Sequence, residues 1–101
     1  MAGSLADFVQ DQLGALAELR RRRMFGGHGL YLGESFFGIV HQERLYFKTS
    51  DATRKEFVNA GMPPFQPNER QTLKSFFEVP AAVIEDRGRL IEWAREAAAI
   101  A

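Results

Sequence analysis

The chain has 101 residues, which is room for one domain, and its 46% hydrophobic content supplies a core without disulfide or metal staples. It contains no cysteine, which excludes a disulfide scaffold, a thiolate zinc site and a cysteine nucleophile. Thirteen basic and thirteen acidic residues balance to zero net charge, whereas a protein that binds nucleic acid on its own usually carries a basic excess.

The first expected element is a helix over about residues 4–18. Ser4 is a typical N-cap residue, and Asp7 lies in the first turn, where the helix dipole favours a negative charge. Apolar residues then recur at helical spacing, at Leu5, Phe8, Val9, Leu13 and Leu16. An isolated helix of this length is marginally stable in water, so the apolar stripe is expected to pack against the domain.

A strand is expected over about residues 24–32, and it contains Gly26, Gly27 and Gly29. Glycine within a strand pattern indicates a bulge, a bend or a close backbone approach, so we expect a kink at Gly26–Gly27. These glycines do not form a phosphate loop, because strand-like residues follow them where such a loop needs a helix.

Two further strands are expected to complete a meander. A tight turn at 33–35 leads to a strand at 36–40 that is apolar on both faces, and a second turn at 41–43 leads to a strand at 44–48. In the last of these, Leu45 and Phe47 should point to one face, and Arg44, Tyr46 and Lys48 to the other.

A second helix is expected to begin at Ser50 or Asp51, and Thr53–Glu56 also matches a capping box. Gly61 suits the position just after its C-terminus, and Pro64, with the proline before it, prevents its continuation.

The last third of the chain is expected to hold a loop at 65–70, a strand at 71–79 and a final helix from Asp86 to about Ala99. A short extra strand at 64–66 is an alternative for the start of the loop. Alternation places Leu73, Phe77 and Val79 on one face of the strand, and Pro80 ends it before a short helical turn at 81–85. The buried side of the final helix comprises Leu90, Ile91, Trp93, Ala94, Ala97 and Ala98.

The element order α-β-β-β-α-β-α predicts a single α+β domain over residues 1–101. We expect two layers, with an antiparallel sheet of about five strands and helices packed on one face. The N-terminus shows no signal peptide, and no apolar run approaches the roughly 20 residues that span a bilayer, so a cytoplasmic protein without membrane contact is expected.

No catalytic, cofactor-binding or metal-binding residue is predicted. His28 and His41 are 13 residues apart, without carboxylates at ligand spacing, and no serine lies in a nucleophile motif. We therefore expect a binding module with no enzyme activity.

The sharpest charge feature is Arg20–Arg23, which could contact phosphates or an acidic partner, or simply form a solvated corner between helix and strand. The candidate interaction residues are Arg21, Arg23, Phe25, Tyr31 and Tyr46. Two alternatives stay open. One is direct nucleic-acid binding by the arginines and the sheet aromatics, which the zero net charge disfavours. The other is a small-molecule pocket that joins His28, Arg23 and a carboxylate.

Several segments together resemble the TfoX (Sxy) N-terminal domain family. They are RRMFGGHGLY at 22–31, LYFK at 45–48, GMPPF at 61–65, FEVP at 77–80 and LIEWA at 90–94. The resemblance extends in order over about residues 5–100. We interpret its motif residues as determining the fold. They are Gly26, Gly27, Gly29, Gly61, Pro64, Pro80 and Trp93.

The resemblance implies an α+β fold with an antiparallel sheet, similar to type III secretion chaperones, and no known enzyme activity or cofactor. It implies a regulatory role, since full-length members are bacterial competence co-activators that work with a cAMP-receptor-type transcription factor. Those members carry a C-terminal helical domain, which we expect to be absent from this stand-alone chain. A transcription-associated protein partner is therefore expected, and a homodimer paired through an exposed edge or face of the sheet stays open.

Overall fold

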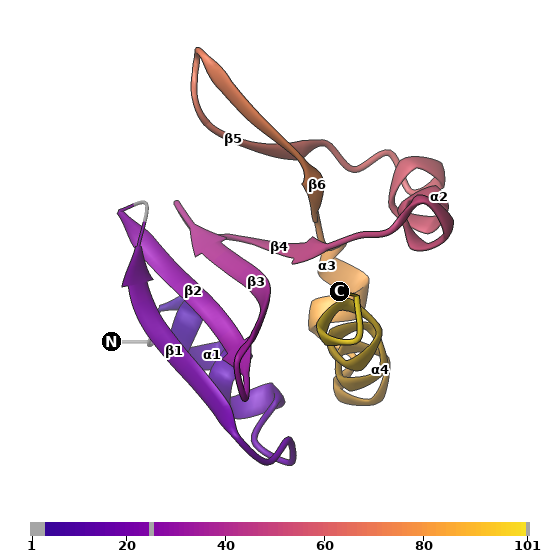
Figure 1. Cartoon of the computed structure of the whole chain (residues 1–101). Helices are drawn as coiled ribbons and strands as arrows, with labels where there is room; N and C mark the ends of the chain where they lie inside the picture. The colour runs from indigo at the N-terminus through magenta and orange to yellow at the C-terminus, as the bar shows by residue number, and fades with distance from the viewer. Residues whose placement is uncertain (1–3, 25, 101) are drawn as a thin grey trace.

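A computed structural model describes residues 4–24 and 26–100, and this part of the chain forms four helices and one six-stranded sheet (Figure 1). The helices are α1 Leu5–Gln12, α2 Asp51–Asn59, α3 Ala81–Ile84 and α4 Arg87–Ala98. The strands are β1 Leu19–Met24, β2 Gly27–Leu32, β3 Ser35–His41, β4 Arg44–Lys48, β5 Pro64–Asn68 and β6 Gln71–Glu78. Every pairing is antiparallel and the strand order is β1-β2-β3-β4-β6-β5. The predicted α+β class is confirmed, with six strands where about five were expected.

Helix α1 is shorter than the predicted 4–18. Its N-terminus is as expected, because the Ser4 side chain accepts from the backbone of Asp7. Beyond Gln12 the chain makes tight turns, in which the Leu16 N–H bonds three residues back, and Glu18 has a φ of 64°. Leu13 and Leu16 remain buried, so the apolar spacing continues although the regular helix has ended.

The glycines at 26 and 27 lie at a hairpin turn, and the prediction of one kinked strand over 24–32 is wrong. Strands β1 and β2 run antiparallel on either side of the turn, from Leu19↔Leu32 to Met24↔Gly27. The backbone passes very close to β3 here, since a Cβ on Gly27 would lie 2.1 Å from the Val40 carbonyl oxygen. Glycine therefore permits the close approach, and the arginines at 20–23 belong to a strand and not to a corner.

Strand β3 is buried on both faces, as predicted, because its side chains contribute to a cluster of buried residues on each side of the sheet. The pairing with β2 shifts between Leu30 and Tyr31, which leaves Phe37 as the extra residue. Phe37 consequently joins the core beneath the helices, while Phe36 lies on the opposite face. The turn after β3 is a two-residue turn in which Gln42 and Glu43 have φ values of 51° and 60°, as hairpin turns require.

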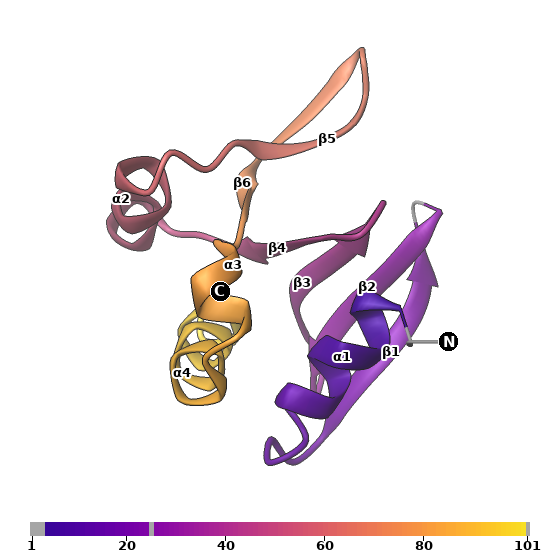
Figure 2. The same cartoon turned by 180° about the vertical axis from the view of Figure 1, so that it is seen from behind.

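The helix-covered face of the sheet forms the main core. Helices α1 and α4 pack on this face, as Figure 2 shows, with α3 joining α4 to the end of β6. The predicted buried side of α4 is confirmed at Leu90, Ala94 and Ala97. The core consists of Val9, Leu13, Leu30, Phe37, Val40, Leu45, Phe47, Phe57, Phe77, Val79, Val83, Leu90 and their smaller neighbours.

The second face of the sheet, opposite the helices, carries a smaller core of Ile39, Tyr46, Phe65 and Phe76, with Phe36 and Leu73 against it. Phe65 is fully buried, with its ring centroid 4.7 Å from that of Tyr46. The predicted loop at 65–70 is thus wrong, and the alternative short strand extends to β5. Register shifts in the β5–β6 pairing also place Leu73 and Phe77 on different faces, against the simple alternation expected.

Helix α2 begins at Asp51, with a capping box between Ser50 and Thr53, so the alternative box at 53–56 is wrong. Gly61 follows its end with a φ of 77°, as predicted. Pro80 ends β6 and is the N-cap residue of α3, and Asp86 caps α4. Among the described residues no helix is long and apolar enough to cross a membrane.

Candidate interaction surface on the first strand

Strand β1 is one of the two edges of the sheet, and it is the edge without proline. In the described part of the chain it pairs only with β2, so its outer backbone groups have no strand partner (Figure 1). The other edge, β5, contains Pro64 and Pro67, which cannot donate backbone hydrogen bonds. Proline and charge are the common protections of an exposed edge, and β1 has only charge, in its four arginines.

The arginines of β1 divide between the two faces of the sheet. Arg21 and Arg23 lie opposite Leu30 and His28, on the helix-covered face. Arg20 lies opposite Tyr31 on the second face, which Arg22 shares by alternation. The candidate residues Arg21 and Arg23 are therefore on the other side of the sheet from Tyr31 and Tyr46, and Phe25 lies outside the described residues.

Arg21 links β1 to helix α1. Its guanidinium Nη1 donates to the Asp7 carboxylate at 2.8 Å and to the Gln10 side-chain oxygen at 2.9 Å. The hydrogen bond from Arg21 lowers the pKa of Asp7 below its usual range. The side chain of Arg21 is only 26% exposed, so this arginine holds the helix on the sheet and has little charge left for a partner.

The other three arginines of β1 are exposed and have no acidic side chain within ion-pair distance in the part of the chain that the structure describes. Arg20 donates to the Gly33 carbonyl oxygen at 2.9 Å, and the Arg22 guanidinium lies 5.8 Å from the centre of the Tyr31 ring. Both contacts orient the guanidinium groups without neutralising them. The strand therefore presents Arg20 and Arg22 on one face and Arg23 on the other as uncompensated charges.

The aromatic residues of the second face do not form an open stacking platform. Tyr31 stacks on Phe36 at 5.1 Å, and Phe36 packs on Phe76 at 5.2 Å. Tyr46 is 8% exposed beneath Phe65, and burial raises its pKa, with a further rise from Glu78 partly offset by Arg44. Tyr31 is the only one of the two candidate tyrosines that reaches the surface beside the arginines.

A hollow of about 380 Å³ at the β1–β2 turn is lined by Arg23, Met24, Gly26, Gly27 and His28. Burial, followed by repulsion from Arg21 and Arg23, lowers the pKa of His28. The predicted small-molecule pocket would also need a carboxylate, and none lines this hollow among the described residues. A positive hollow of this kind suits an anionic group better than acid–base chemistry.

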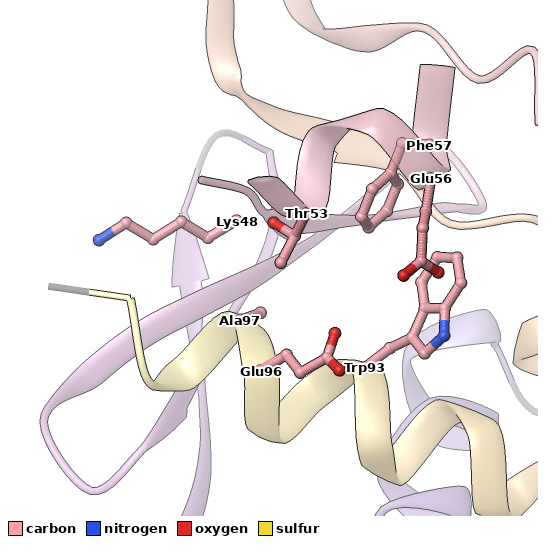
Figure 3. Close-up of a pocket in the computed structure, with 7 residues that line it drawn as sticks. All are labelled: Lys48, Thr53, Glu56, Phe57, Trp93, Glu96 and Ala97. Atoms are coloured by element: carbon pink, nitrogen blue, oxygen red, sulfur yellow. The ribbon is translucent and has the colours of Figure 1, made fainter. Parts of the chain in front are cut away.

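A second hollow lies between α2 and α4, where Figure 3 shows the Glu56 carboxylate beside the Trp93 indole, with Glu96 also lining the hollow. Trp93 packs edge-on against Phe57, with ring centres 4.8 Å apart. The enclosed space is about 10 Å³, which is room for about one water molecule. No group of three or more potential metal ligands occurs among the described residues.

The arginine run was predicted from the sequence, but the pair of its members that stays free of an ion pair was not. The predicted pair, Arg21 and Arg23, includes the one arginine of β1 that an internal ion pair neutralises. Arg20 and Arg22 are the exposed pair on a single face. Strand alternation separates the two pairs, but only the position of Asp7 on α1 decides that Arg21 is the arginine whose charge is compensated.

Two comparisons with known proteins bear on this surface. The model of the TfoX N-terminal domain family matches residues 11–101, which includes the whole of β1. A protein of Spirochaeta aurantia, described as an uncharacterized 12.7 kDa protein in the trpE 5′ region, is 41% identical over 56 residues. That alignment covers 55% of this chain and 49% of the relative, about half the length of each.

Proposed function

Because this chain belongs to the TfoX N-terminal domain family, we propose that it is a regulatory module that acts by binding another protein, without catalysis, through strand β1. The observation that carries the proposal is the set of three exposed and uncompensated arginines on a proline-free sheet edge. Charged residues fixed in position on a rigid strand provide specificity and fast association with a partner of opposite charge.

The expected partner is a transcription factor of the cAMP-receptor type, which is the partner that the family resemblance implies. Its binding surface for this domain should be acidic, because the charges that β1 offers are all positive. The zero net charge of the chain supports a protein partner over the nucleic-acid backbone, since the arginines are a local feature and not part of a general basic excess.

The test is a binding measurement between the purified chain and the purified factor from the same cell. The double variant Arg20→Glu with Arg22→Glu should bind at least about tenfold more weakly. The matched control is Lys55→Glu with Arg95→Glu, which makes the same change in charge on exposed positions of α2 and α4. Equal loss in both variants, or no binding of the factor by the parent chain, would count against the proposal.

Direct nucleic-acid binding is the second candidate, because Arg20 and Arg22 share one exposed face and could contact successive phosphates. It predicts retention of an oligonucleotide at low salt that weakens steeply as salt is raised, with a clear loss on Arg20→Ala plus Arg22→Ala. If the oligonucleotide is not retained at low salt, this second candidate is excluded.

A further inference from the structure

We propose that β1 receives an extended, acidic segment of the partner protein as an additional strand of the sheet. This inference rests on the proposed function and specifies the form in which the partner binds. Strand addition uses the free backbone groups of a sheet edge for affinity and the alternating side chains for specificity. Of the two edges of this sheet, β1 offers an unbroken row of backbone groups, whereas Pro64 and Pro67 interrupt the row on β5.

The arrangement of charge on β1 defines the segment that fits. Side chains of an added strand alternate between the same two faces and lie about 4.5–5.5 Å from their cross-strand neighbours at Cβ. Acidic residues at alternate positions would therefore meet Arg20 and Arg22 on the second face. On the helix-covered face an acidic residue would meet Arg23, while the position next to Arg21 needs only a neutral residue, because Asp7 already pairs with that arginine.

A second copy of this chain is a poor occupant of the same edge. Antiparallel pairing of two β1 strands about Arg22 would set Arg22 against Arg22 and Arg21 against Arg23 of the other copy, and pairing about Arg21 would set Arg20 against Arg22. Like charges directly opposite one another destabilise a strand pair, and charge of one sign along an edge is a common protection against self-pairing. The arginines thus disfavour a homodimer through β1 and select a segment of opposite charge.

Nucleic acid also fits this edge less well than a strand does. The uncompensated charges project from both faces of β1, with Arg20 and Arg22 on one side and Arg23 on the other. A backbone of phosphates lying along one face would reach only part of this charge, whereas an added strand reaches both faces at once. The Tyr31 ring beside them is already stacked on Phe36 and contacts Arg22, so it offers no free place for a base.

The inference is tested with a synthetic peptide about as long as β1 that has glutamate at the positions opposite Arg20, Arg22 and Arg23 and threonine at its other positions. Its matched control has the same glutamates but proline in place of each threonine, which keeps the charge and removes backbone donors. We expect the control to bind at least about tenfold more weakly. Amide hydrogen exchange of the full chain should show new protection in β1 with the threonine peptide and no change in β5. The Arg20→Glu, Arg22→Glu variant should lose both effects.

Three results would overturn the inference. The first is equal binding of the two peptides, which would mean charge attraction without strand addition. The second is peptide binding without new protection in β1. The third is tighter binding of an oligonucleotide with the same number of negative charges. If the transcription factor binds the chain while β1 gains no protection, strand addition is wrong but the proposed function stands. If the factor does not bind and the peptide does, the proposed partner is wrong, but the inference that β1 binds an acidic strand stands.

Discussion

Replacing Gly27 with alanine should destabilise the domain far more than the addition of one methyl group suggests. The new Cβ would lie 2.1 Å from the carbonyl oxygen of Val40, 3.1 Å from its carbonyl carbon and 3.2 Å from the Cα of His41. All three atoms are backbone atoms of β3, so no side chain can rotate away to make room. Strands β2 and β3 must separate locally, and the hairpin that carries the arginines must shift with them.

The size of the effect follows from two contributions. Inserting a methyl group into a packed site costs about 1–3 kcal/mol, and each strand hydrogen bond weakened by the separation costs about 1 kcal/mol more. We expect a loss of about 3–4 kcal/mol in the free energy of unfolding. Since about 1 kcal/mol corresponds to roughly 4–8 °C in a domain of this size, the melting temperature should fall by at least about 12 °C.

Urea unfolding followed by the fluorescence of the single tryptophan, Trp93, measures this loss. The matched control is Gly61→Ala, where an added Cβ meets nothing within 4 Å and only the φ of 77° opposes the side chain. That control should cost about 1–2 kcal/mol. If Gly27→Ala is no more destabilising than Gly61→Ala, the close approach of β2 to β3 is not present in the folded protein.

Three further predictions concern both faces of the sheet. Phe65→Ala should cost about 3–5 kcal/mol in urea unfolding, because the ring is fully buried, and a cost below about 1 kcal/mol would mean that β5 does not close the second face. Trp93→Ala should cost about 2–3 kcal/mol, less than a fully buried tryptophan, because the indole is only half-buried; a loss under about 1 kcal/mol would instead mark Trp93 as an exposed anchor for a partner. Folding should weaken as the pH falls through 6.5, because burial and the charges of Arg21 and Arg23 make the folded chain bind the His28 proton less readily than the unfolded chain does. His28→Gln should flatten this part of the stability curve, and an unchanged slope would assign it to another group.

Local signals in the sequence were sufficient for most element ends. The caps at Ser4 and Asp86 and the glycine after α2 were predicted correctly, and Ser50 was one of the starts considered for α2, because each depends on bonds within a few residues. The two faces of β4 also followed from alternation alone. These features need no knowledge of the rest of the chain.

The errors came where distant segments decide the outcome. The glycines at 26 and 27 could either kink one strand or form the turn of a hairpin. They form a hairpin turn because β1 pairs along the whole of β2. Phe65 was predicted to lie in a loop, because its local sequence does not decide between a loop and a short strand. The five residues of β5 form a strand through pairing with β6, and Phe65 packs against Tyr46. Strand pairing is a long-range interaction that the local pattern of a short segment does not specify.

By itself, the sequence determined the fold class, the cysteine-free core and the presence of four consecutive arginines. Only the tertiary structure decided that these arginines lie on an edge strand, that Asp7 neutralises Arg21, and that Arg20, Arg22 and Arg23 stay uncompensated. The physical reason is that composition fixes how much charge a chain carries, whereas the charge available to a partner depends on which side chains the fold brings together.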